Sequence, residues 1–176
     1  MKANLKRGEL PSENIKINIC GSKSESNRLL ILQAQFPNIS IENLSDSDDT
    51  AVLQKGLKIS KGTVDVHHAG TAMRFLTAYF AATEGTEVLL TGSPRMQQRP
   101  IGILVDALKS LGADIEYAQN EGFPPLRIIG KKLLKNEVRI KADVSSQYIS
   151  ALMLIAPALP KGLKIFLQGK TTSVPY

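Results

Sequence analysis

The sequence predicts an α/β fold built from a recurring unit in which strands alternate with helices. Strand-like runs, such as residues 15–19, where apolar residues alternate, and residues 87–91 and 138–142, are followed by turns rich in Gly, Ser or Pro and then by apolar helical stretches. Strands that alternate with helices in this way are typical of α/β proteins. The units are unequally spaced along the chain, so a regular solenoid is not expected.

The first segment is predicted to hold a strand over residues 15–19, a helix over 27–35, a strand over 39–44 and a second helix. The second helix starts at the Ser/Asp cluster of residues 45–49, because these residues are favoured at the positive end of a helix. It is expected to run to about residue 59 and to stop before Gly62.

The second and third segments repeat the plan. In the second segment the predicted strands and helices cover residues 63–67 (strand), 72–83 (helix), 87–91 (strand), 101–111 (helix), 113–117 (strand) and 126–129 (strand). In the third they cover residues 138–142 (strand), 147–158 (helix) and 163–168 (strand), so that this last unit is expected to be incomplete. Gly85 and Gly112 end the two helices of the second segment.

The composition is that of an ordinary globular protein. Hydrophobic residues make up 43% and charged residues 22% of the 176 residues. One cysteine, Cys20, excludes an internal disulfide framework. We find no apolar run long enough to span a bilayer and no apolar core of a signal peptide near the N-terminus. A cytoplasmic protein without a membrane partner is therefore expected.

The formal net charge of +6 suggests an anionic partner. Nucleic acid is not expected, because the basic residues are scattered, Trp is absent and no Lys/Arg stripe is interleaved with aromatic residues. A small polyanion would use the same charge excess. Composition alone does not choose between them.

Each predicted unit has a similar turn where its first helix opens. The three turns read Gly21-Ser-Lys-Ser24, Ala69-Gly-Thr71 and Ser145-Ser-Gln147. Unpaired N–H groups and the helix dipole make such ends anion-binding sites. Arg28 and Arg74 lie one turn further along, and helical side chains lean back toward the N-terminus. If the units are related by rotation, three positive ends face one space. Taken singly, each turn is as well explained by ordinary helix capping.

The segment from Gly92 to Ile101 adds two arginines between a strand and a helix. Pro100 suits the first position of a helix, which puts Arg99 where the chain enters that helix. On local evidence, Arg99 serves equally well as an anion ligand or as a loop residue that satisfies carbonyl groups.

No metal site or organic cofactor is expected. His67 and His68 are neighbours on a predicted strand and would point to opposite faces, which suits chelation badly. Asp46, Asp48 and Asp49 lack the glycine of a calcium-binding loop. The turn containing Lys23 also differs from a P-loop, in which Gly and Lys are adjacent.

Five segments resemble the EPSP (5-enolpyruvylshikimate-3-phosphate) synthase family, in the family's order and over nearly the whole chain. They are residues 21–30, 69–74, 95–101, 145–147 and 173–176. The related UDP-N-acetylglucosamine enolpyruvyl transferases resemble the chain less well, because they have Asn where Ser24 stands. The resemblance implies a two-domain enolpyruvyl transferase fold built from βαβαββ units. Residues 1–20 would belong to one domain, and residues 21–176 would hold two units and part of a third from the shikimate-phosphate side.

The resemblance also implies an activity. The family transfers the enolpyruvyl group of phosphoenolpyruvate to the 5-hydroxyl of shikimate 3-phosphate, releasing phosphate, in the biosynthesis of aromatic amino acids. The family's catalytic Asp and Glu lie in a later part that this sequence does not contain. The chain alone is therefore expected to be inactive without that C-terminal part. A binding module for phosphorylated metabolites, without catalysis, remains the alternative.

The residue roles implied by the resemblance fall into groups. Lys23 would be catalytic and would contact both substrates. Gln147 would also contact both substrates but would have no catalytic role. Shikimate 3-phosphate would also be held by Ser24, Arg28, Ser145, Ser146, Ser173 and Tyr176. Phosphoenolpyruvate would be held by Gly70 and Arg99, with Thr71 and Arg74 in support. The chain departs from the family at Cys20 and Phe75, where Pro is usual, and at His68, where Asn is usual.

Overall fold

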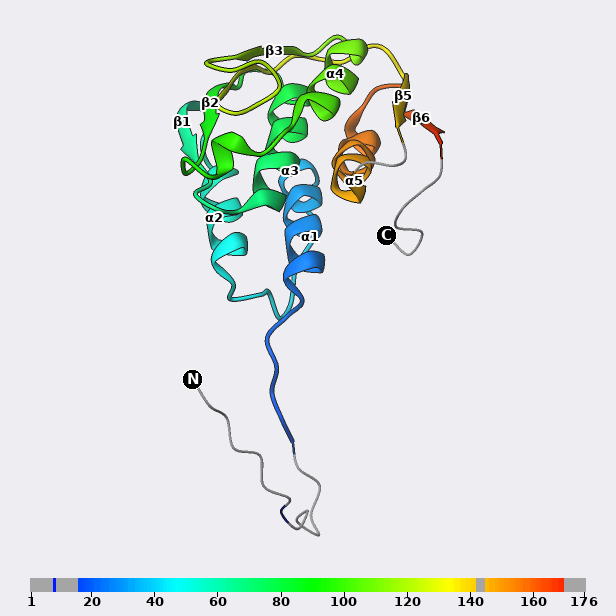
Figure 1. The fold of residues 1–176 in the computed structure, drawn as a ribbon. Coiled ribbons are helices and arrows are strands. Elements are labelled where there is room, and N and C mark those ends of the chain that lie inside the picture. The colour runs from blue at the N-terminus through cyan, green and yellow to red at the C-terminus, as the bar shows by residue number, and fades with distance from the viewer. Residues whose placement is uncertain (1–7, 9–15, 142–144, 170–176) are drawn as a thin grey trace.

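The computed structural model describes residue 8 and residues 16–141 and 145–169, and these form the expected α/β fold. Figure 1 shows a four-stranded sheet at the upper left and a two-stranded sheet at the right. Helices α1 (Lys23–Gln35), α3 (Gly70–Ala82) and α5 (Ser146–Ile155) lie side by side and contact one another.

The middle of the chain forms one continuous βαβαββ unit. Its further elements are β1 (Lys61–Asp65), β2 (Glu87–Thr91), α4 (Gly102–Leu111), β3 (Asp114–Tyr117) and β4 (Leu126–Ile129). A 3-10 turn, η1 (Met96–Gln98), precedes α4. The strand order is β1-β2-β4-β3, with β1 and β2 parallel and the other two pairs antiparallel. The predicted strands 87–91 and 126–129 are confirmed to the residue.

Helix α3 is the centre of the core. Its residues are apolar nearly all round, and a helix of that kind is stable only when it is buried on every side. Phe75, Leu76 and Phe80 are at most 1% exposed. The helix packs against β2 and β4 on the sheet and against α1, α4 and α5. This packing fixes the position of its first turn, which carries Gly70 and Thr71.

The third segment forms a small sheet of its own. Strands β5 (Glu137–Lys141) and β6 (Lys164–Gln168) pair in parallel, and α5 crosses between them. The helix predicted over residues 147–158 divides into α5 and the 3-10 turn η2 (Ala156–Ala158), because Pro157 lacks the N–H that an α-helix interior needs. Among the described residues, no helix has the length and apolar character needed to cross a bilayer.

The strand predictions for the first segment are wrong. None of the described residues 16–20 or 39–44 lies in a strand. Ile17 and Ile19 are 76% and 78% exposed, so their alternation has no partner strand among the described residues. In the second stretch, Asn43 has a φ of 52°, which breaks an extended conformation. The segment is instead part of the loop between α1 and α2 (Asp48–Gly56), and the Gln33 side-chain amide donates to its Ile39 carbonyl oxygen at 2.8 Å.

Several element boundaries also move: the strand predicted over residues 63–67 is β1, and the helix predicted over 72–83 is α3, which begins at Gly70. Helix α1 begins at Lys23, earlier than predicted, because the Ser22 hydroxyl accepts a hydrogen bond from the Glu25 N–H and caps the helix. Helix α2 ends at Gly56 and not near residue 59.

Gly130 offers a test of how tightly the unit is packed. A Cβ added there would overlap the carbonyl oxygen of Thr83 and the hydroxyl of Thr86. Backbone cannot move aside cheaply, so we expect Gly130→Ala to lower the free energy of unfolding by about 2–3 kcal/mol. Gly102→Ala is the control, because its Cβ would lie 3.4 Å from the nearest atom, an ordinary contact, and should change stability by less than about 0.5 kcal/mol. Urea unfolding of both variants measures this, and equal stabilities would contradict the packing.

Candidate functional site

The first turns of α1, α3 and α5 meet at one pocket. Its volume is about 310 Å³, and its lining residues are Lys23, Ser24, Asn27, Arg28, Thr71, Ser146 and Gln147. The three helix openings therefore do face a common space. Each contributes backbone N–H groups and the positive end of a helix dipole. Among the described residues, two cationic side chains and no carboxylate line the pocket, so the arrangement favours an anionic ligand.

Arg28 ties two of these helices together. Its Nη1 donates to the Ser24 carbonyl oxygen at 2.8 Å and to the Ser24 hydroxyl at 2.7 Å. Its Nη2 donates to the Ser150 hydroxyl on α5 at 3.2 Å. The guanidinium also lies over the ring of Phe75, 5.4 Å from the centroid. These partners are all neutral, so within the described residues no carboxylate compensates the positive charge of Arg28 at the edge of the pocket.

A second link joins α3 to α5. Gln147 Nε2 donates to Thr71 Oγ1 at 3.2 Å. At the start of α5 the Ser145 hydroxyl accepts from the Gln147 N–H at 3.4 Å and caps the helix. The hydrogen bonds hold both helix openings at the same pocket, and Ser146 lines it between them.

Lys23 pairs with a residue that sequence reasoning did not connect to it. Its Nζ lies 3.6 Å from Asp49 Oδ2 in the first turn of α2. The lysine side chain is 53% exposed, so the pair is solvated and weak. It keeps the ammonium group at the mouth of the pocket while leaving it accessible to a ligand.

A buried polar seam holds the first turns of α1 and α2 against each other. Asn27 is fully buried, and its Oδ1 accepts from the Thr50 hydroxyl at 2.8 Å. The Ser26 hydroxyl accepts from the Ser45 N–H at 3.0 Å. Sequence reasoning missed this seam, because Ser26 and Asn27 stand among other polar residues in the first half of α1 and no local pattern marks them as buried. The seam determines where Lys23 and Asp49 lie relative to each other.

Arg74 is buried rather than directed into the pocket. It is 7% exposed, its Nη1 donates to the Gly70 carbonyl oxygen at 2.7 Å, and its guanidinium lies 5.3 Å from the centroid of the Tyr148 ring. Burial lowers the pKa of Arg74; Tyr148 opposes this shift and the charge of Arg99 adds to it. Within the described chain its Nε has no hydrogen-bond partner. Arg74 therefore supports the turn at Gly70 from behind.

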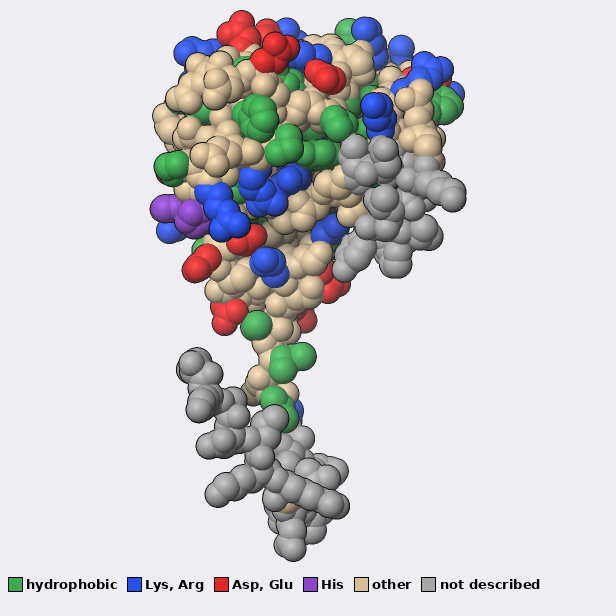
Figure 2. Space-filling view, in the orientation of Figure 1, with side chains coloured by type: hydrophobic (Ala, Val, Ile, Leu, Met, Phe, Trp, Pro, Cys, Tyr) green, Lys and Arg blue, Asp and Glu red, His purple; other side chains and the backbone are tan. Residues whose placement is uncertain are grey.

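Arg99 lies on the other side of Gly70. A Cβ at Gly70 would be 2.5 Å from Arg99 Nη1 and 3.0 Å from Arg74 Nη1, so the absence of a side chain lets both guanidinium groups approach the turn. Arg99 lines a pocket of about 470 Å³ with His68, Arg95 and Met96. Figure 2 shows Lys and Arg side chains gathered beside the two histidines on this face.

Some of the predicted positions remain untested. Ser173 and Tyr176 lie outside the described residues. The described part of the chain holds no group of three or more His, Cys, Asp or Glu residues placed to bind a metal ion.

Comparison with known proteins gives a consistent set of matches. A sequence model of EPSP synthase (3-phosphoshikimate 1-carboxyvinyltransferase) matches residues 46–176. A 3-phosphoshikimate 1-carboxyvinyltransferase of Bacteroides fragilis is 53% identical over 161 residues, which is 91% of this chain and 39% of that protein. One from Colwellia psychrerythraea is 40% identical over 190 residues, covering 93% and 44%.

The fold has a solved counterpart. The structure of EPSP synthase from Acinetobacter baumannii superposes with a TM-score of 0.73 at 17% identity, over 89% of this chain and 41% of that one. The chain thus spans about two fifths of the length of the relatives that it matches.

The structural role of Arg74 is testable by stability. Arg74→Ala removes the contact with Gly70 and the interaction with Tyr148 and leaves a cavity, so we expect the free energy of unfolding to fall by about 1–3 kcal/mol. The control is Arg95→Ala, an exposed arginine nearby, which should change it by less than about 0.5 kcal/mol. Urea unfolding at constant m-value measures both changes. Indistinguishable stabilities would show that the Arg74 guanidinium does not support the turn.

Proposed function

The chain belongs to the EPSP synthase (3-phosphoshikimate 1-carboxyvinyltransferase) family, and on that premise we propose that it forms the shikimate-phosphate side of a synthase active site. The reaction is transfer of the enolpyruvyl group from phosphoenolpyruvate to the 5-hydroxyl of shikimate 3-phosphate, with release of phosphate. The enzyme would act in the cytoplasm, in the biosynthesis of aromatic amino acids. Both substrates are polyanions, which suits the net charge of +6.

The observation that carries the proposal is the meeting of three helix openings at one pocket whose described lining residues include Lys23 and Arg28 and no carboxylate. Helix N-termini bind phosphate through backbone N–H groups, and arginine adds charge-assisted hydrogen bonds to phosphate or carboxylate. A phosphorylated, hydroxylated substrate finds both kinds of donor here. Hydroxyl and amide side chains, from Ser24, Ser146 and Gln147, are available for its remaining oxygens.

Each side chain has a role in this proposal. Ser145 and Ser146 cradle the phosphate of shikimate 3-phosphate together with Ser173, while Ser24, Arg28 and Tyr176 hold the rest of that substrate. Gly70, through its backbone, and Arg99 hold phosphoenolpyruvate. Gln147 and Lys23 contact both substrates, and Thr71 and Arg74 fix the turn between them. The ammonium group of Lys23 supplies a positive charge and a transferable proton at the point where the two substrates would meet.

The acid–base chemistry requires more than this pocket. The methylene carbon of phosphoenolpyruvate must gain a proton and the attacking hydroxyl must lose one, and both groups need a partner within hydrogen-bond reach. Lys23 is the one acid–base side chain lining the described pocket. In our proposal, carboxylates from the C-terminal part found in the longer relatives complete the site. Residues 1–20 belong to the facing domain in the whole enzyme, and the exposure of Ile17 and Ile19 supports a partner for that segment.

Binding of shikimate 3-phosphate tests the proposed pocket. We expect the chain to bind this substrate more weakly than a full-length relative does, because only part of the contacts are present. Arg28→Ala should weaken the binding about tenfold to a hundredfold, through the loss of a charge-assisted contact. Arg127→Ala, which changes an exposed residue of strand β4, is the matched control for the loss of one positive charge. Calorimetry distinguishes the two variants, and equal affinities would remove Arg28 from the site. Binding of oligonucleotides with an affinity that falls steeply as the salt concentration rises would favour a nucleic-acid partner instead.

Catalysis is tested separately. We expect no phosphate release above background from the 176-residue chain with both substrates. One acid–base group typically contributes about a hundredfold to ten-thousandfold, and closure around aligned reactants contributes roughly 7–11 kcal/mol. Lys23→Ala serves as the control for contaminating enzyme. Turnover that disappears in Lys23→Ala would mean that this chain carries its own acid–base groups.

A further inference from the structure

In the part of the chain that the structure describes, basic and apolar side chains line the pocket beside Gly70. Its residues, His68, Arg95, Met96 and Arg99, come from two loops, one between β1 and α3 and the other between β2 and α4. None of these described lining residues is a carboxylate. Three nitrogen-bearing side chains around a space of about 470 Å³ form a site for an anionic group. Only Arg99 has a place in the function proposed above.

His68 is held in position by the opposite loop. Its Nδ1 lies 2.8 Å from Ser93 Oγ, and the Ser93 N–H donates to the His67 carbonyl oxygen at 3.0 Å. Ser93 Oγ also accepts from the Met96 N–H at 3.3 Å. These contacts clamp the two loops together and fix the imidazole at the rim of the pocket. An exposed side chain held in this way loses less entropy on binding a ligand.

The hydrogen bond at Nδ1 of His68 determines whether the other ring nitrogen, Nε2, acts as a donor or an acceptor. When the Ser93 hydroxyl donates to Nδ1, the proton of a neutral imidazole is on Nε2, and in the charged imidazole both nitrogens carry protons. In both cases Nε2 presents an N–H to the pocket. An anion held by Arg95 and Arg99 would favour these forms over the one tautomer that presents a lone pair.

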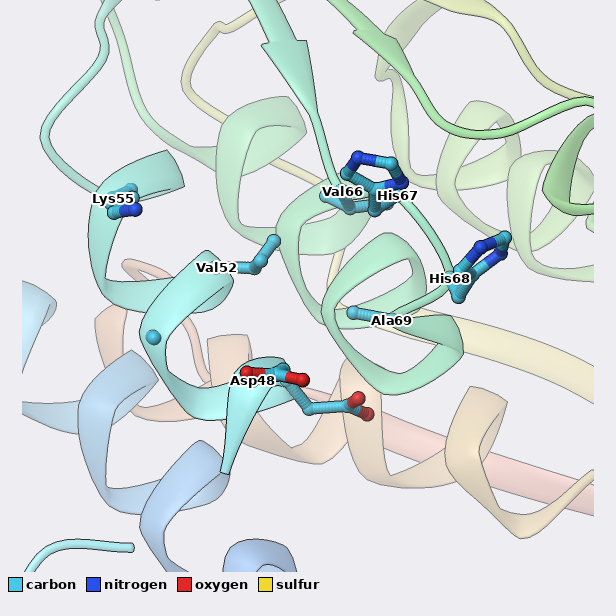
Figure 3. Close-up of a pocket in the computed structure, with 9 residues that line it drawn as sticks. Asp48, Val52, Lys55, Val66, His67, His68 and Ala69 are labelled. Carbon is cyan, nitrogen blue, oxygen red and sulfur yellow. The ribbon is translucent and has the colours of Figure 1, made fainter. Parts of the chain in front are cut away.

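Competing charges lie on the other side of the turn. His67 and His68 also border a second pocket, of about 470 Å³, which includes Asp48, Asp49 and Lys55 from α2. Figure 3 shows the His68 ring apart from Asp48, at the far edge of this pocket. His67 has a φ of 51°, and its N–H donates to Asp65 Oδ1 at 2.7 Å. This tight turn separates the two rings, whose centroids are 5.4 Å apart, so that His67 does not line the basic pocket.

We propose that His68 is an additional ligand for phosphoenolpyruvate, donating from Nε2 to an anionic oxygen that Arg95 and Arg99 also hold. This rests on the proposed function and deepens it: His68 and Arg95 extend the phosphoenolpyruvate subsite beyond Gly70 and Arg99. An imidazole reaches further than the Asn that is usual at this position in the family. His68 thereby becomes a determinant of affinity that is particular to this chain.

The experiment is calorimetric titration of the full 176-residue chain with phosphoenolpyruvate in four forms. They are the unchanged chain, His68→Ala, His67→Asn and Arg99→Ala. His67→Asn is the matched control, because it removes the adjacent imidazole while Asn tolerates a positive φ. We expect His68→Ala to raise the Kd about fivefold to tenfold, as for one partly solvated hydrogen bond to a charged group, and His67→Asn to leave it unchanged. Imidazole ¹⁵N resonances should show phosphoenolpyruvate shifting His68 Nε2 and leaving His67 in place.

The outcomes separate the two levels of the proposal. Weaker binding in Arg99→Ala with unchanged binding in His68→Ala overturns the role of His68 and leaves the proposed function standing. Equal losses in His68→Ala and His67→Asn also overturn it, since the effect would then belong to the turn as a whole. An unchanged Kd in Arg99→Ala, or the absence of binding in all four forms, overturns the proposed phosphoenolpyruvate site and the role of His68 with it. Unchanged thermal unfolding in all variants confirms that affinity and not folding is measured.

Discussion

The burial of α3 on every side is the constraint on which the rest of the structure depends. This helix contacts the four-stranded sheet, α1, α4 and α5, and its large residues have almost no exposed surface. Its first turn must therefore emerge at the junction of the neighbouring elements. The openings of α1 and α5 lie at the same junction, which brings three helix dipoles to one pocket. The candidate site is a direct consequence of how the core packs.

Positive charges that lie close together repel one another, and in this protein neutral hydrogen-bond partners hold them in place. Arg28 is bonded to hydroxyl and carbonyl oxygens, and Arg74 to a carbonyl oxygen and an aromatic ring. Within the described residues, the one carboxylate paired with a lysine or arginine of this region is Asp49, beside Lys23. Neutral oxygens orient a guanidinium group without cancelling its charge. The site is thus held in shape while its attraction for anions is preserved.

The sequence predicted those features that a local pattern determines. Strands β2 and β4 were located to the residue because each is a short apolar run with Gly or Pro close to both ends, and the helix openings were found because Gly, Ser and Thr mark such turns. The alternation of Ile17 and Ile19 misled, since alternation indicates a face to be buried but not the presence of a partner strand. The Asn27–Thr50 seam and the His68–Ser93 contact were missed for a related reason. Each joins residues far apart in the chain, and nothing local in the sequence records such a pairing.

The hydrogen bonds of the pocket connect distant parts of the chain. Arg28 and Ser150 are separated by 122 positions, and Thr71 and Gln147 by 76. Contacts of such long range form late in folding, because the loops that they close must first lose conformational entropy. The pocket therefore has no early, partly formed version: it comes into being when α5 docks against α1 and α3, and it is lost when α5 detaches. Binding of an anion at this pocket would be thermodynamically linked to the docking of that helix, so a bound ligand would raise the free energy needed to open this part of the fold.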